Sequence, residues 1–224
     1  MKKCFIITAY FDGDLSRFLS QLMQNEHSAF IICADGGYEL ALSCGIVPNL
    51  VIGDADSGSM TSDAATVQQA DILKSLNKTE FIRIKREKDE SDTFVAVQHA
   101  VNSGFESIDI IGGIGGRLDH TISNIQTLAH FSSHTKQITM ADDANFITIV
   151  ENSSITLLKK ENFFISLFSF SDICSGVTTT GLYYPLENAT LRNAYPLGLS
   201  NEFTDAEATI KVEHGKLLVL MSKK

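Results

Sequence analysis

The sequence has no long apolar run, few prolines and no closely spaced pair of cysteines. Its 224 residues include only three prolines, and 44% of them are hydrophobic, a composition typical of a folded globular protein rather than a disordered one. No segment approaches the roughly 18 consecutive apolar residues that a membrane-spanning helix requires. The apolar run that follows Lys2 and Lys3 is too short for a signal peptide. We therefore expect no membrane partner and a cytoplasmic location.

Positive charge is also scarce. The chain has 18 Lys and Arg residues against 27 Asp and Glu residues, which gives a formal net charge of −9. A nucleic-acid-binding surface normally carries a basic stripe, so we expect no nucleic-acid partner. Small anionic ligands are compatible with this charge only where a metal ion or local basic groups reverse its sign.

The four cysteines show no CxxC spacing, which argues against a zinc or dithiol redox site. Cys4 and Cys33 lie inside apolar, strand-like runs, and we interpret them as small buried hydrophobic residues.

What the sequence does contain, over residues 1–143, is an alternation of strand and helix patterns. Short apolar, β-branched runs typical of strands covered on both faces occur at residues 4–9, 30–34, 50–52, 81–84 and 108–111. Apolar residues at helical spacing occur at residues 15–23, 92–101 and 118–129. Strands that alternate with helices predict an α/β domain with a mostly parallel, Rossmann-like sheet and flanking helices.

From residue 144 the pattern changes to strands without intervening helices. We predict strands at residues 146–150, 155–158, 163–170 and 177–182, and a hairpin formed by residues 208–213 and 216–221 around His214 and Gly215. Short strands separated by turns indicate a small β-sandwich or barrel. We therefore expect two domains, 1–143 and 144–224.

Acidic residues recur where the predicted strands of the first domain end. They are Asp35, Asp54, Asp56, Asp89, Glu90, Asp92 and Asp119. Aspartate disfavours strands and is costly to bury unpaired, so its repetition at these points suggests one shared rim of carboxylates. Such a rim would repel a phosphate unless a hard cation lay between them. The pattern predicts a magnesium-dependent enzyme that acts on a polyphosphate.

Asp54 and Asp56 are the strongest metal candidates. Residues i and i+2 of an extended chain point to the same side, so both carboxylates can face one Mg²⁺ ion. The alternative is an Asp-rich turn stabilised by its own side chains.

Residues 88–92 begin the second predicted helix. Asp89 and Asp92 are three residues apart and can face one ion, and Lys88 can neutralise charge beside a phosphate that the helix N-terminus attracts. A capped, charged first turn without a ligand is the alternative.

A glycine-rich loop at residues 112–116 lies between a predicted strand and a predicted helix. Its glycines let the backbone approach a ligand closely, as in a phosphate cradle, although it matches neither the Walker nor the GxGxxG spacing. Arg117 beside it can bind phosphate with two parallel hydrogen bonds. For His120, a surface position bonded to Asn124 is an equal alternative.

In order and spacing, these motifs resemble those of the thiamine pyrophosphokinase (thiamine diphosphokinase) family. The resemblance rests on Asp35-Gly36-Gly37, Gly53-Asp54-x-Asp56-Ser57, Lys88-Asp89-x-Ser91-Asp92, Gly112-Gly113-x-Gly115-Gly116-Arg117-x-Asp119-His120 with Asn124, and Gly198-Leu199-Ser200-Asn201-Glu202.

The resemblance implies an N-terminal α/β catalytic domain that binds ATP, a C-terminal all-β sandwich that binds thiamine, and a homodimer with its active sites at the subunit interface. It implies transfer of pyrophosphate from ATP to the hydroxyl of thiamine, releasing AMP. The residues expected at the metal and in catalysis are Asp54, Asp56, Asp89 and Asp92, with Arg117 stabilising charge. Those expected to bind the nucleotide are Asp35, Gly36, Gly37, Lys88, Gly113, Gly115, Gly116, Asp119 and Asn124.

Ser200 and Asn201 are expected to hydrogen-bond the aminopyrimidine of thiamine. Because the chain has no tryptophan, any aromatic packing on the thiamine rings must use Phe or Tyr. Tyr183 and Tyr184 are candidates, with packing at a strand end as the alternative. Rival functions are a metal-dependent nucleotide phosphohydrolase and a non-catalytic thiamine or nucleotide sensor.

Overall fold

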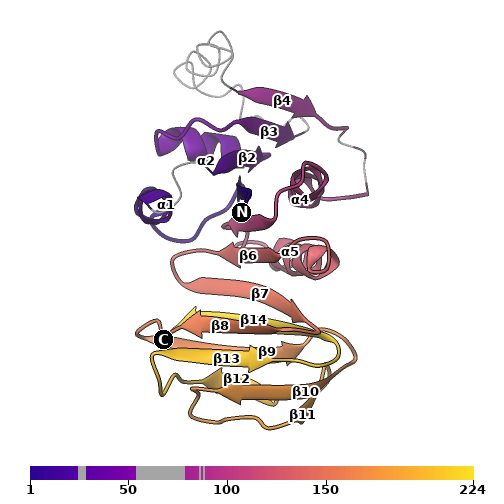
Figure 1. Cartoon of the computed structure of the whole chain (residues 1–224). Coiled ribbons are helices and arrows are strands. Elements are labelled where there is room, and N and C mark those ends of the chain that lie inside the picture. Colours follow the sequence, from indigo (N-terminus) through magenta and orange to yellow (C-terminus); the bar gives the residue numbers. More distant parts are fainter. Residues whose placement is uncertain (25–28, 54–78, 86, 88) are drawn as a thin grey trace. The chain divides into compact units, whose positions relative to one another are not determined.

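The computed structural model describes residues 1–24, 29–53, 79–85, 87 and 89–224. The chain separates into two compact units (Figure 1). The first comprises residues 1–127 and 134–143, and the second comprises residues 128–133 and 144–224. In the described part of the chain, no helix is both long enough and apolar enough to cross a membrane.

The first unit is built on a parallel sheet. Its strands are β1 (Lys3–Ile7), β2 (Phe30–Ala34), β3 (Leu50–Gly53), β4 (Glu80–Arg83), β5 (Ser107–Ile111) and β6 (Gln137–Ala141). They lie in the order β6-β5-β1-β2-β3-β4, and every neighbouring pair is parallel. The predicted mixed α/β fold with a parallel sheet is thereby confirmed.

Helices cover both faces of this sheet. They are α1 (Leu15–Gln24), α2 (Gly37–Ser43), α4 (Asp92–Asn102) and α5 (Leu118–Phe131). α1 and α2 lie on one side of the strands, and α4 and α5 lie on the other (Figure 1). This arrangement explains why β1, β2, β3 and β5 are almost continuously apolar, because successive side chains point to opposite faces and both faces are buried. The edge strand β4 is largely exposed.

Alternate residues of β1 illustrate the two-sided burial. Phe5 and Ile7 pack in a cluster with Leu15 and Leu19 of α1, while Cys4 and Ile6, which point the other way, are also fully buried. Each large apolar side chain buried in this way contributes about 1.5–3 kcal/mol. Burial rather than local propensity therefore accounts for these short strands.

The second unit contains two antiparallel sheets. Its strands are β7 (Asn145–Glu151), β8 (Ser154–Leu158), β9 (Phe163–Ser169), β10 (Ile173–Thr180), β11 (Ala189–Arg192), β12 (Gly198–Asn201), β13 (Glu207–Lys211) and β14 (Lys216–Lys223). One sheet runs β12-β9-β14-β7 and the other β11-β10-β13-β8.

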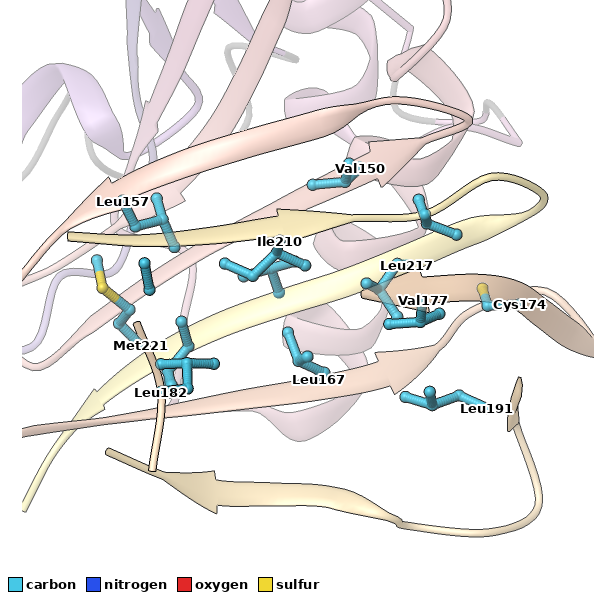
Figure 2. Packing of buried hydrophobic residues seen from close by; sticks show 14 of the residues in the cluster. Val150, Leu157, Leu167, Cys174, Val177, Leu182, Leu191, Ile210, Leu217 and Met221 are labelled. Carbon is cyan, nitrogen blue, oxygen red and sulfur yellow. The ribbon is translucent and has the colours of Figure 1, made fainter. Parts of the chain in front are cut away.

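One apolar cluster is shared by these two sheets (Figure 2). Leu167 and Leu217 contribute from one sheet, and Val177, Leu191 and Ile210 contribute from the other. Burial alternates along β9 and β14, as expected for strands with a single buried face.

The predicted hairpin at the C-terminal end is wrong. β13 pairs with β10 and β8, whereas β14 pairs with β7 and β9, so the chain changes sheets at Gly215. Both strands present alternate apolar residues to the same core, Ile210 from β13 and Val219 from β14. The alternation is therefore the same as in a hairpin, although the strands lie in different sheets.

Candidate active site

A cavity of about 580 Å³ lies at the carboxyl ends of the parallel strands in the first unit. β1 has β5 on one side and β2 on the other, so the chain connections run in opposite directions from this point. Open α/β sheets bind ligands in the crevice that such a reversal creates. The cavity is lined by Ala9, Tyr10, Ala34, Asp35, Ser91, Asp92, Thr93, Gly113, Gly115, Gly116, Arg117, Asp119, His120, Ser123 and Asn124.

The N-terminal ends of two helices face this cavity. Ser91 is the N-cap of α4, and its hydroxyl accepts a hydrogen bond from the Phe94 amide at 3.2 Å. Ser91, Asp92 and Thr93 all line the cavity, as do the residues that begin α5. Backbone N–H groups at a helix N-terminus have no partner within the helix and carry a partial positive charge. They suit an anionic ligand.

The glycine loop after β5 is held in place by hydrogen bonds from outside it. The Gly113 amide donates to the Tyr10 carbonyl at 2.7 Å, and the Asn124 amide nitrogen donates to the Gly113 carbonyl at 2.9 Å. Asn124 is buried, whereas Gly115 and Gly116 are exposed. The loop is therefore anchored at Gly113 and again at Gly115, whose amide donates to the Thr121 hydroxyl at 3.0 Å, and Gly115 and Gly116 line the cavity.

Arg117 is paired with Asp119, and both residues line the cavity. Its Nε and Nη2 donate to the two carboxylate oxygens of Asp119 at 3.1 and 2.6 Å. This pairing lowers the pKa of Asp119 and raises the pKa of Arg117. Because the two side chains are 71% and 66% exposed, the pair contributes little to stability, and the guanidinium can exchange one anionic partner for another.

Asp35 follows β2 at the same edge. Its backbone lies in the left-handed region with φ +47, and its amide donates to the Ile52 carbonyl at 2.9 Å. A side chain on Gly37 is excluded, because a Cβ there would lie 2.1 Å from the Ile7 carbonyl oxygen. Gly37 thus lets the start of α2 pack directly against β1.

In the second unit, the side chains of Ser200 and Asn201 are in different environments. Ser200 is exposed and has φ +57, whereas Asn201 is only 8% exposed. The Asn201 amide bonds to the backbone of Tyr184, at 3.0 Å from its N–H and 2.7 Å from its carbonyl. Its side chain therefore already has protein partners.

Comparison with known proteins identifies the family. The family model for the thiamin pyrophosphokinase catalytic domain matches residues 21–140, and the model for the vitamin B1 binding domain of the same family matches residues 152–217. A thiamine pyrophosphokinase of Bacillus subtilis is 30% identical over 199 residues, which cover 88% of this chain and 89% of the relative.

The chain belongs to the thiamin pyrophosphokinase family.

Solved structures from this family have the same fold. The crystal structure of the Bacillus subtilis thiamine pyrophosphokinase superposes with a TM-score of 0.84 at 27% identity, covering 99% of this chain and 100% of that one. The yeast thiamin pyrophosphokinase has a TM-score of 0.77 at 14% identity, covering 100% of this chain and 86% of that one. The fold is therefore shared even where little sequence identity remains.

Several residues predicted from the thiamin pyrophosphokinase motifs meet in the cavity. Three motifs that lie far apart in the sequence contribute to its lining: Asp35, Asp92, and the set Gly113, Gly115, Gly116, Arg117, Asp119 and Asn124. Asp89 is exposed and does not belong to the lining, and neither do Gly36 and Gly37.

Asp54, Asp56 and Lys88 lie outside the described residues. Among the residues that are described, no three His, Cys, Asp or Glu side chains gather closely enough to hold a metal ion. The carboxylates that do line the cavity are those of Asp35, Asp92 and Asp119. The roles assigned to the two metal candidates remain predictions.

Tyr10 is a cavity residue that the sequence reasoning missed. It is 43% exposed, and its ring lies against the glycine loop, since a Cβ on Gly115 or Gly116 would be 3.2 Å from ring atoms. A signal for it was present in the sequence. Tyr10 follows the first predicted strand, as Asp35 follows the second, and the ends of parallel strands share one edge of a sheet.

Proposed function

We propose that this chain transfers the pyrophosphoryl group of ATP to the hydroxyl of thiamine, producing thiamine diphosphate and AMP. The Bacillus subtilis relative bears the name of this activity, and models for its catalytic and vitamin-binding parts match this chain in order. The observation that carries the proposal is the cavity of the first unit, which combines helix N-termini, a glycine loop and Arg117. These are the groups that a polyphosphate requires.

ATP binds, in this proposal, to the predicted N-terminal domain, residues 1–143. The exposed backbone of Gly116 and the first turn of α4 take phosphate oxygens. Gly115 is held by the Thr121 hydroxyl, and Asn124 keeps Gly113 in position through its 2.9 Å hydrogen bond. Asp35, Gly36 and Gly37 shape the neighbouring edge, and Asp119 borders the site. Lys88 adds positive charge.

Mg²⁺ fits the donor set of this site. Asp35, Asp92 and Asp119 line the cavity with carboxylates, the hard oxygen ligands that Mg²⁺ prefers, and Asp92 is the one of the four predicted metal ligands among them. A net negative cavity accepts ATP only with compensating positive charge. We assign the ion to Asp54, Asp56, Asp89 and Asp92. Held by these carboxylates, Mg²⁺ would neutralise charge on the phosphate oxygens.

The chemical step is an in-line displacement. The hydroxyl oxygen of thiamine attacks the β-phosphorus of ATP, the bond from that phosphorus to the bridging oxygen of the α-phosphate breaks, and AMP leaves with the electron pair. A carboxylate, for which we favour Asp56, accepts the hydroxyl proton. Arg117 stabilises the charge on the transferred group, and its exposed pairing with Asp119 leaves it able to turn to the phosphates.

Thiamine binds to the predicted C-terminal domain, residues 144–224, which we interpret as a β-sandwich because its two sheets share one core. Ser200 and Asn201 mark the binding region, with the exposed Ser200 as the direct contact. We further propose a homodimer with its active sites at the subunit interface.

Measuring AMP release from Mg-ATP with and without thiamine tests this function. Thiamine-dependent AMP production supports it, and Asp54→Ala abolishes that production while the protein stays folded. Equal AMP production without thiamine indicates the rival nucleotide phosphohydrolase. Binding of thiamine without turnover indicates a sensor.

A further inference from the structure

Two aromatic residues follow β1 one after the other, and they lie in different surroundings. Phe11 packs against Phe18 of α1, with ring centroids 5.3 Å apart, beside the apolar cluster of that face. Tyr10 lines the cavity instead and is 43% exposed. Packing in the core therefore accounts for Phe11 and leaves the ring of Tyr10 available to a ligand.

The backbone of Tyr10 is fixed by close contacts. Its carbonyl accepts hydrogen bonds from the Gly113 amide at 2.7 Å and from the Thr8 hydroxyl at 3.3 Å, and a Cβ on Gly112 would lie 2.2 Å from the same oxygen. The ring is placed by Gly116, where a Cβ would be 3.2 Å from two of its atoms. A ring positioned before the ligand arrives loses less conformational freedom on binding.

The part of the cavity next to Tyr10 is lined by small apolar residues. Ala9 precedes Tyr10, and Ala34 ends β2, the strand that pairs with β1. Asp35 borders this part at the end of β2. The groups suited to phosphate come from the N-terminal ends of α4 and α5, where Arg117 lies. The lining thus combines a polar part with a smaller apolar and aromatic part.

We propose that Tyr10 binds the adenine base of ATP by stacking, with Ala9 and Ala34 beside the base. The phosphate-binding groups leave the base without a partner, and every base has a π face that stacks on an aromatic ring. His120, the other aromatic side chain in the lining, lies in the first turn of α5 near Arg117, among the groups suited to phosphate. The inference rests on the proposed function.

Two ligands separate the base from the phosphates. Mg-ATP without thiamine carries both, whereas inorganic tripolyphosphate with Mg²⁺ carries phosphates alone, and calorimetric titration gives Kd for each without turnover. Tyr10→Phe keeps the ring, and Tyr10→Leu keeps apolar bulk on the glycine loop but loses the flat ring. Tyr195→Leu is the matched control, because Tyr195 is 65% exposed, lies in the second unit and does not line the cavity.

We expect Tyr10→Leu to raise Kd for Mg-ATP about 3- to 10-fold, without changing Kd for tripolyphosphate or KM for thiamine. Tyr10→Phe and the control should match the wild type with both ligands. If Tyr10→Leu does not fold, Tyr10→Met replaces it with the same expectation, since its flexible apolar side chain also covers the glycine loop.

An equal rise in Kd for tripolyphosphate would show that the ring only holds the glycine loop, and would overturn the inference. An unchanged Kd for Mg-ATP would overturn it as well, and a rise in KM for thiamine alone would assign the ring to thiamine instead. Failure of the proposed function is distinguishable, because the wild-type protein would then bind Mg-ATP without releasing AMP in the presence of thiamine.

Discussion

Gly113→Ala tests how the glycine loop is anchored, and Gly104→Ala provides a matched control. Both glycines have nearly the same backbone angle, φ +74 at Gly113 and φ +75 at Gly104, so an alanine pays the same cost of about 1–2 kcal/mol for the left-handed region at either position. The surroundings differ. A Cβ at Gly104 meets nothing within 4 Å, whereas a Cβ at Gly113 lies 2.6 Å from the Asn124 Nδ2.

The extra cost at Gly113 follows from that contact. The Asn124 amide is the flexible end of a side chain and moves aside, which breaks its 2.9 Å hydrogen bond to the Gly113 carbonyl. Asn124 is 5% exposed, so its amide then has no access to water. Leaving a buried donor unsatisfied costs about 1–3 kcal/mol. We expect Gly113→Ala to be less stable than Gly104→Ala by that amount.

Urea unfolding and steady-state kinetics measure both consequences. We expect ATP to bind only when the loop has its wild-type conformation. The cost of 1–3 kcal/mol to recover that conformation then lowers kcat/KM for ATP about 5- to 150-fold. Gly104→Ala should retain the wild-type value. Equal stability and equal kcat/KM in the two variants would refute the proposed anchoring by Asn124.

Three further predictions concern Tyr10, Arg117 and Cys4. Tyr10→Ala removes the ring that lies on the glycine loop and should raise KM for ATP about 3- to 10-fold, while Tyr10→Phe stays close to the wild type; equal defects would implicate the hydroxyl instead. Arg117→Lys loses the ability to donate two parallel hydrogen bonds to one phosphate and should lower kcat about 10²- to 10³-fold. Pairing lowers the pKa of Asp119 from its usual 3.8, so this carboxylate stays ionised between pH 6 and 9 and the loss in kcat should be constant there. A loss that varies with pH in this range would contradict this reasoning. Burial raises the pKa of the Cys4 thiol from 9.0 to about 12, so the unfolded chain loses this proton at lower pH than the folded chain. The free energy of unfolding should therefore fall as pH rises from 9 to 12, by up to about 1.4 kcal/mol per pH unit, and Cys4→Ala should reduce this slope in urea titrations; an unchanged slope would assign the fall to other groups.

The sequence predicted the parallel strands well because their burial on both faces leaves a clear pattern. The predicted run at residues 108–111 corresponds to β5, and the helix predicted at residues 92–101 corresponds to α4, with Ser91 as its cap. Helix α2 and strand β6 were not predicted. α2 is only seven residues long, too short for helical periodicity to show.

Pairing between strands was harder to predict than the strands themselves. β13 and β14 were expected to form a hairpin, but each pairs within a different sheet. The local pattern of alternating apolar residues fixes which face is buried, and it contains no information about the neighbouring strand.

Site residues that belong to a motif of charged residues or glycines could be predicted from the sequence. Site residues that depend on contacts between segments distant in the sequence could not. Asp92, Arg117 and Asn124 were expected together and do line one cavity. Tyr10 was missed because its position after the first predicted strand was its one signal, and an aromatic residue there forms no distinctive motif. The hydrogen bonds of Asn201 to the Tyr184 backbone depend on two segments meeting in the fold, which no spacing in the sequence reveals.

Following the label of [γ-³²P]ATP tests the proposed function most directly. Pyrophosphoryl transfer predicts that, with Mg²⁺ and thiamine present, the label appears in thiamine diphosphate, with one labelled product for each AMP released. Label recovered as free phosphate or pyrophosphate, with none in thiamine diphosphate, would contradict the transfer.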